Sequence, residues 1–159
     1  MIVSLIARPV AAAGRVGLIA FMGLALSACS SAEDRLTLHT AKGAFSFSVE
    51  IADDSAEREK GLMFRDHLAA DAGMLFDYGQ EQMASFWMQN TLIPLDMIFI
   101  GADGVVKNIH VNARPLDTTS IPSKFPIRFV LEIPGGRSTE IGLAVGDRVE
   151  HPRIAKPAD

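Results

Sequence analysis

The sequence of 159 residues contains a single cysteine, Cys29. One thiol cannot close an intramolecular disulfide, and it cannot form the thiolate cluster that holds structural zinc or iron–sulfur. The four histidines show no metal-ligand spacing. The G-x-S-x-G and H-E-x-x-H motifs of hydrolases and a glycine-rich phosphate-binding loop are absent as well. The sequence therefore predicts neither a metal nor a cofactor, and it identifies no reaction.

Basic residues are also in short supply, with 15 Lys and Arg against 19 Asp and Glu and a net charge of -4. Residues 1–28 contain Arg8 and Arg15 and no acidic residue, so the remaining chain has 13 basic and 19 acidic residues, and 13 − 19 gives −6. Nucleic-acid binding requires a basic face. We therefore expect no nucleic-acid partner.

Residues 1–28 have the three parts of a secretory signal peptide. Arg8 and Arg15 give the positive start, and residues 16–26 (VGLIAFMGLAL) form an apolar run too short to span a bilayer comfortably. The following Leu26-Ser27-Ala28-Cys29 resembles the lipobox of bacterial lipoproteins. In such signals the cysteine receives lipid and becomes the first residue of the mature protein.

The lipobox implies that Cys29 carries lipid and that residues 29–34 form a short polar tether. Two or three acyl chains hold a protein stably on a membrane, whereas one binds only marginally. The domain is then expected at the periplasmic side of the cell envelope, close to its membrane. Ser30 favours the outer membrane over the inner one where two membranes are present. An ordinary signal peptide with a chance cysteine, or an uncleaved anchor, is the alternative.

The rest of the chain predicts a mainly β fold of the α+β class. Residues 44–51 alternate apolar and polar side chains with a period of two, which is typical of a strand with one buried face. This strand pairs with residues 36–39 in a predicted hairpin, and 95–100 pairs with 105–111 in a second. Further strands are expected at 73–76, 83–89, 128–133 and 148–150. Because no βαβ rhythm is visible, we predict a single-domain antiparallel β-sandwich or barrel over residues 35–151 and a flexible tail over 152–159.

One or two short helices complete the prediction. Asp54 is placed to cap a helix, with Glu57 three residues later as its capping-box partner. Ser138 is placed to cap one helical turn over residues 138–143. The polar run after Tyr78 is expected to be a loop. The proline-containing stretch 112–127 is expected to be a lid or connector without a core contribution.

Residues 86–100 (FWMQNTLIPLDMIFI) form the densest apolar run of the domain and include its only tryptophan, Trp87. Asn90, Thr91 and Asp96 interrupt this run. A carboxylate in an apolar strand costs several kcal/mol unless it is paired or hydrogen-bonded. The partners of Asp96 are either a ligand or the backbone amides of the turn at residues 90–94, and the structural role is favoured.

Other polar groups could join Asp96 in a site. Glu132 lies on the less apolar face of its strand, and Arg65 could pair with Glu132 or with Asp96. Trp87 is a core residue if both faces of its strand are covered, and otherwise lines a cleft for a sugar or small polar ligand. The candidate ligand-binding residues are Arg65, Trp87, Asn90, Asp96 and Glu132. Five methionines of the domain are interpreted as core-filling residues, not as a copper site.

Several motifs together resemble the DUF192 family, a family of unknown function. They are Glu57, Gly61–Arg65, Gly73–Phe76, Phe86–Thr91, Pro94–Asp96, Leu131–Glu132 and Gly146–Asp147. The resemblance covers about residues 36–150. Gln89 stands where the family often has Lys, so no role is assigned to a cation there. The resemblance implies a small, mainly β, often exported bacterial domain without an assigned activity.

Two functions are compatible with this pattern. The favoured one is a lipid-anchored, non-enzymatic domain of the cell envelope that binds a small polar ligand or an envelope protein. The alternative is an envelope hydrolase that uses Asp96 and Glu132, which requires both carboxylates in one cleft. A third interpretation gives the polar residues a purely structural role.

Overall fold

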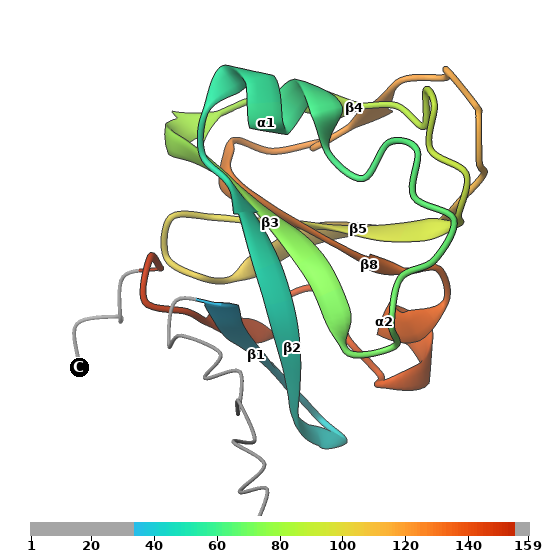
Figure 1. Cartoon of the computed structure of the whole chain (residues 1–159). Coiled ribbons are helices and arrows are strands. Elements are labelled where there is room, and N and C mark those ends of the chain that lie inside the picture. Colours follow the sequence, from blue (N-terminus) through green and yellow to red (C-terminus); the bar gives the residue numbers. More distant parts are fainter. Residues whose placement is uncertain (1–33, 155–159) are drawn as a thin grey trace, which may run out of the picture.

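The computed structural model describes residues 34–154, which form a mainly β single domain as predicted (Figure 1). The strands are β1 (Arg35–Thr40), β2 (Gly43–Ala52), β3 (Ala72–Gln82), β4 (Ser85–Phe86), β5 (Leu95–Ile100), β6 (Val106–Ala113), β7 (Ile121–Pro122), β8 (Ile127–Pro134) and β9 (Arg148–Glu150). The helices are α1 (Ser55–Lys60) and α2 (Arg137–Glu140). Neither helix has the length or the apolar character to cross a membrane, within the part of the chain described. The predicted signal peptide, Cys29 and most of the tether lie outside these residues.

Seven strands form one curled sheet in the order β6-β5-β8-β3-β2-β1-β9, and β4 pairs with β7 in a second small sheet. The two edges of the large sheet approach each other at one end. Val105 and Arg148 form a bridge there, the Val106 N–H donates to the Asp147 carbonyl at 2.9 Å, and the Val149 N–H donates to the Gly104 carbonyl at 2.8 Å. The result is a half-barrel in which these contacts partly protect both edge strands.

The strand pairs of the large sheet are antiparallel with one exception, the parallel pair β2 and β3. Parallel neighbours require a crossover connection, and residues 53–71, which include α1, supply it. The expectation of no βαβ unit is therefore wrong at this place. The helix of the crossover has only six residues, too few to give a clear helical period in the sequence.

Two sequence-based boundaries also differ from the structure. Strand β3 continues through the predicted loop as far as Gln82, where it still pairs with Ile127 of β8. Conversely, only Ser85 and Phe86 of the predicted strand 83–89 are β-structure. The stretch 112–127 does contribute to the core, because β7 lies in it and Ile121, Ser123 and Ile127 are buried.

The large sheet is covered on both faces. One core cluster lies inside the curl and contains residues from all seven strands; its largest members are Phe47, Phe129, Leu36, Leu38 and Leu75. The second cluster lies on the opposite face, beneath α1, β4 and β7; it includes Leu62, Phe76, Met88, Met97 and Phe99. Strands β3, β5 and β8 contribute to both clusters, so successive residues of these strands enter different environments.

The predicted capping box of α1 is confirmed. The Asp54 carboxylate accepts from the Glu57 N–H at 2.8 Å, and the Glu57 carboxylate accepts from the Asp54 N–H at 3.4 Å. Helix α2 departs from the prediction, because it begins at Arg137 and has Gly136, with φ +84°, as its N-cap. Ser138 does not cap it, since its hydroxyl donates to Asp96.

The prediction of a flexible tail over residues 152–159 is wrong for residues 152–154. Ile154 is buried in the first core cluster, and the Arg153 guanidinium pairs with Asp53 at 2.7 Å. Residues 152–154 are therefore part of the folded domain. The prediction for residues 155–159 lies outside the described residues.

Candidate functional site

Asp96 is a structural anchor of the loops at one end of the sheet. It is fully buried, and its carboxylate accepts four hydrogen bonds. Oδ1 accepts from the N–H groups of Asn112 and Gly136, both at 2.7 Å. Oδ2 accepts from the Ser138 N–H at 2.7 Å and from the Ser138 hydroxyl at 2.6 Å. Its partners are therefore residues of two distant loops, and not the amides of the turn at 90–94 that the sequence suggested.

Asp96 and Glu132 lie on opposite faces of the sheet. Asp96 is directly opposite Ile133, whereas Glu132 is directly opposite Met97. Paired residues of neighbouring strands point to the same face, and Ile133 and Met97 belong to the two different core clusters. The two carboxyl groups therefore cannot meet in one cleft, which removes the geometry that the predicted acid–base pair requires.

Glu132 is a buried acid that has no hydrogen-bond partner among the described residues. Only 5% of the residue is exposed, and Met74 and Met97 are its neighbours on the adjacent strands. No donor among residues 34–154 hydrogen-bonds to its carboxyl group. Burial raises the pKa of Glu132 to about 8, because transfer from water penalises the charged form. Glu132 is therefore predominantly protonated at neutral pH.

A cavity of about 250 Å³ opens beside this carboxyl group, and we call it the Glu132 cavity. It is lined by Arg58–Met63, Phe76, Tyr78, Ser85–Trp87, Thr91 and Glu132. The residue after α1, Gly61, forms one wall with φ +47°. A Cβ atom at this position would lie 3.2 Å from the Phe76 ring and 4.0 Å from Oε2 of Glu132. The backbone conformation, with φ +47° and ψ −135°, therefore favours glycine here, and a Cβ atom would also press against the Phe76 ring.

Aromatic side chains form the opposite wall of the Glu132 cavity. Phe86 packs edge-on against Phe76, with ring centroids 5.3 Å apart, and against Phe99 at 5.9 Å. Trp87 is 53% exposed at the rim, so the interpretation of Trp87 as a core residue is wrong. Successive side chains alternate here, so Phe86 and Met88 point inward and Trp87 between them points outward.

The turn that carries Asn90 borders a neighbouring hollow and not the Glu132 cavity. This second hollow has a volume of about 340 Å³ and shares Trp87 with the first. Asn90 and Phe64 both have positive φ, at +55° and +63°, and the Phe64 N–H donates to the Asn90 carbonyl at 2.8 Å. Positive φ in a bulky residue costs of the order of 1–3 kcal/mol. The rim is thus built from two strained turns held together by one hydrogen bond.

Arg65 contacts neither predicted partner. Its guanidinium makes two hydrogen bonds to the Glu50 carboxylate, at 2.6 and 2.5 Å. Both side chains are substantially exposed, at 37% for Arg65 and 54% for Glu50. The prediction that Arg65 pairs with Asp96 or Glu132 is therefore wrong, because a surface carboxylate on the outer positions of β2 lies nearer.

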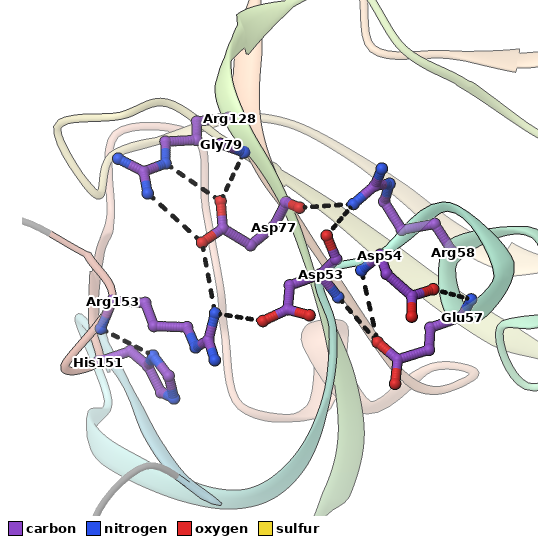
Figure 2. A network of polar contacts seen from close by, with 9 residues as sticks. All are labelled: Asp53, Asp54, Glu57, Arg58, Asp77, Gly79, Arg128, His151 and Arg153. Carbon is purple, nitrogen blue, oxygen red and sulfur yellow. Dashed lines mark hydrogen bonds and ion pairs between the residues drawn. The ribbon is translucent and has the colours of Figure 1, made fainter.

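A polar network fixes α1 against β3 and so positions the wall of the cavity that contains Gly61 (Figure 2). Arg58 donates to the backbone carbonyls of Asp53, at 2.5 Å, and Asp77, at 3.1 Å. The same guanidinium lies over the Tyr78 ring, 5.3 Å from its centroid. Burial raises the pKa of Tyr78, and the charge of Arg58 opposes this effect.

Asp77 is the centre of this network. Its carboxylate accepts from Arg128 Nε at 3.1 Å and from the Gly79 N–H at 2.8 Å, and Arg153 approaches to 3.9 Å. Sequence reasoning missed Asp77, although it interrupts the apolar segment 74–78 as Asp96 interrupts its own strand. The same criterion, a carboxylate within an apolar strand, could have identified it.

The described residues contain no group of three or more His, Cys, Asp or Glu side chains that could hold a metal ion. Three of the five methionines, Met74, Met88 and Met97, are buried in the second core cluster. Met63 is half-buried at the cavity wall, and Met83 is exposed. The core-filling interpretation therefore holds for three of them.

Comparison with known proteins gives a family match and close structural relatives. The family model for DUF192, described as an uncharacterized ACR, matches residues 37–151. A crystal structure from Sinorhizobium meliloti 1021, described as a candidate transcription regulator, has a TM-score of 0.74 and 43% identity; the match covers 76% of this chain and 94% of that one. A protein of unknown function from Novosphingobium aromaticivorans DSM 12444 has a TM-score of 0.72 and 46% identity, covering 73% and 83%. No curated protein matches the chain.

Proposed function

The chain belongs to the DUF192 family, and we propose that its domain is a non-enzymatic binding module that takes a small polar ligand in the Glu132 cavity. The observation that carries this proposal is the Glu132 carboxyl group, which is buried at the cavity without a hydrogen bond from residues 34–154. A ligand that donates a hydrogen bond to this carboxyl group would supply the partner that residues 34–154 do not provide.

The shape of the site favours a small ligand. Known pockets for small molecules are concave and mostly apolar, with a few polar groups, and range from roughly 300 to 1,000 Å³. At about 250 Å³ the Glu132 cavity lies just below this range. Its aromatic wall supplies apolar contact, whereas Glu132, Ser85 and Thr91 supply polar atoms. The segments that carry the family resemblance contribute much of this lining, at Gly61–Met63, Phe76, Phe86–Trp87, Thr91 and Glu132.

Two other functions have less support. Hydrolysis by Asp96 and Glu132 would need both carboxyl groups in one cleft, but the two residues face opposite sides of the sheet. The Sinorhizobium relative is described as a candidate transcription regulator. A nucleic-acid contact would need a basic face, and the net charge of -4 does not favour the same role here.

We place this module in the cell envelope, attached by lipid at Cys29. The support is the sequence Leu26-Ser27-Ala28-Cys29 after a positively charged, apolar leader. Replacement of Cys29 by alanine should shift the expressed protein out of the membrane fraction and remove the mass of the lipid. Membrane retention without lipid in the Cys29→Ala variant would favour an uncleaved anchor instead.

Ligand binding is tested by thermal unfolding of the purified protein against saccharides, short peptides, small acids and small amines. A ligand at 100 times its dissociation constant adds about 2.7 kcal/mol to stability, which raises Tm by several degrees at this size. The shift should disappear in Glu132→Gln, which keeps the shape of the side chain. It should persist in Arg65→Gln, which changes a surface ion pair. A shift that is equal in all three proteins would place the binding site elsewhere.

A further inference from the structure

On the basis of the proposed function, we infer that the ligand of the Glu132 cavity is a small organic cation, an amine, whose charge lies against the Glu132 carboxylate between aromatic side chains. The first observation is the state of the carboxyl group itself. It is more than nine-tenths buried and lines the cavity, and it has no hydrogen-bond donor among the described residues. A buried carboxylate is stable only beside a positive partner or several donors.

The cations of the protein at this cavity are Arg58 and Lys60, both from α1. Arg58 is already engaged, because it donates to two backbone carbonyls and lies over the Tyr78 ring. Lys60 is exposed at the last turn of the helix. Neither forms an ion pair with Glu132, so the place of the counter-charge is open to a ligand.

The walls of the cavity suit a cation. Phe76, Tyr78, Phe86 and Trp87 all line it, and aromatic faces attract ammonium groups through their quadrupole. Aromatic side chains beside a buried carboxyl group are an arrangement that suits an amine. An anionic ligand would meet the same aromatic faces unfavourably.

The remaining titratable groups around the cavity carry charges of both signs. Helix α1 contributes Glu59 next to Arg58 and Lys60, and β3 contributes Tyr78. The β4 segment contributes Ser85, Phe86 and Trp87, and the neighbouring strands place Met74 and Met97 beside Glu132. The side chains of Ser85, Phe86, Trp87, Met74 and Met97 carry no charge in the physiological pH range.

A pH dependence of binding follows from this arrangement. Glu132 has a pKa of about 8 in the free protein, so an amine must displace its proton in order to bind at neutral pH. An alkylammonium group keeps its own proton in this range, as a lysine side chain does. Affinity should therefore rise about 50-fold between pH 6 and pH 8, in proportion to the ionised fraction of Glu132.

Trp87 makes the test specific, because it is the only tryptophan of the chain and lies at the cavity. Its fluorescence is followed during titration with n-butylammonium, n-butanol and butyrate, three probes of similar size with positive, zero and negative charge. We expect a saturable response to n-butylammonium at least 10-fold tighter than to the other two. Glu132→Gln should weaken that response at least 10-fold, whereas Glu140→Gln, at an exposed position outside the cavity, should change it less than 3-fold.

The outcomes separate this inference from the proposed function. If butanol or butyrate binds as tightly as n-butylammonium and still depends on Glu132, the cavity binds ligands but is not a cation site. Binding of n-butylammonium that is unchanged in a folded Glu132→Gln variant, as verified by its unfolding curve, also overturns the inference. If none of the three probes changes the fluorescence and the ligand panel gives no thermal shift, both the inference and the proposed function fail.

Discussion

Asp96 and Glu132 are two buried acids on neighbouring strands of one sheet, yet they differ in the number of hydrogen bonds that they accept. Asp96 accepts four hydrogen bonds, at distances from 2.6 to 2.7 Å. Glu132 accepts none from residues 34–154 and lies beside two methionines and a cavity. Both residues are at most 5% exposed, so burial alone does not separate a structural acid from a candidate binding residue. The number of nearby hydrogen-bond donors separates the two.

The comparison also separates two parts of the molecule. Four hydrogen bonds to the Asp96 carboxylate connect the surrounding loops to the sheet. At the Glu132 end, the hydrogen bonds of Asp77 and Arg58 stabilise the cavity wall, and none of them involves Glu132. A matched exchange of carboxyl for amide at both positions therefore tests the comparison directly.

The largest effect is expected for Asp96→Asn. The amide group replaces one carboxylate oxygen by NH₂, which then faces the donors of Ser138 or those of Asn112 and Gly136. Donors left without an acceptor in a buried site cost about 3–5 kcal/mol in total. Urea denaturation at pH 7 should show this loss with an unchanged m-value. A loss below about 1 kcal/mol would mean that the four hydrogen bonds do not persist in solution.

Glu132→Gln should behave differently, and its effect should depend on pH. The pKa is about 8 in the folded protein and near 4.5 when the residue is unfolded. Between these values the folded state holds a proton that the unfolded state has lost. The stabilising contribution is therefore complete below pH 4.5 and is lost as pH rises through 8, at up to about 1.4 kcal/mol per pH unit.

Gln carries no proton that titrates, so Glu132→Gln should remove this slope. We expect the variant and the parent to have similar stability at pH 5. At pH 8 the variant should be more stable by about 2–4 kcal/mol. Urea denaturation at pH 5, 6, 7 and 8 measures both slopes, and parallel curves for the two proteins would show that Glu132 is ionised and paired in solution.

A smaller effect is expected for Ser138→Ala. The change removes the hydroxyl donor at 2.6 Å but leaves the Ser138 N–H bonded to Asp96. A hydrogen bond to a charged group contributes about 1.5–3 kcal/mol, and we expect a loss near 2 kcal/mol in urea denaturation. Thr139→Ala, on an exposed position of the same helix, is the matched control and should change stability little. Equal losses in the two variants would assign the effect to the helix and not to Asp96.

The sequence alone located the strands with alternating patterns and the capped start of α1, because those signals are local. Asp96 could be singled out for the same reason, as a carboxylate within an apolar strand. Its partners could not be named, because Asn112, Gly136 and Ser138 are 16, 40 and 42 residues away. Only the register of the folded sheet brings them to the carboxylate.

The Glu132 cavity depends on the same kind of long-range information. Its walls come from the end of α1, from β3, from β4 and from β8, and the parallel pairing of β2 with β3 was not visible in the sequence. The sequence identified Glu132 and Trp87 as candidates. It could not show that Asp96 would point to the other face, since that requires knowing which residues of β5 and β8 are paired.

The smallest effect is expected at Arg65, which the sequence suggested as a partner of one of the two acids. Its ion pair with Glu50 is largely exposed, and such pairs contribute about 0–1 kcal/mol and weaken with salt. Arg65→Gln, Glu50→Gln and the double variant form a cycle, and urea denaturation at low and high salt should give a coupling energy within this range. Removal of a partner from a buried acid would instead cost about 3–5 kcal/mol at both salt concentrations. A loss of that size would mean that Arg65 reaches Asp96 or Glu132 in solution, and the assignment of partners to the two acids would then be wrong.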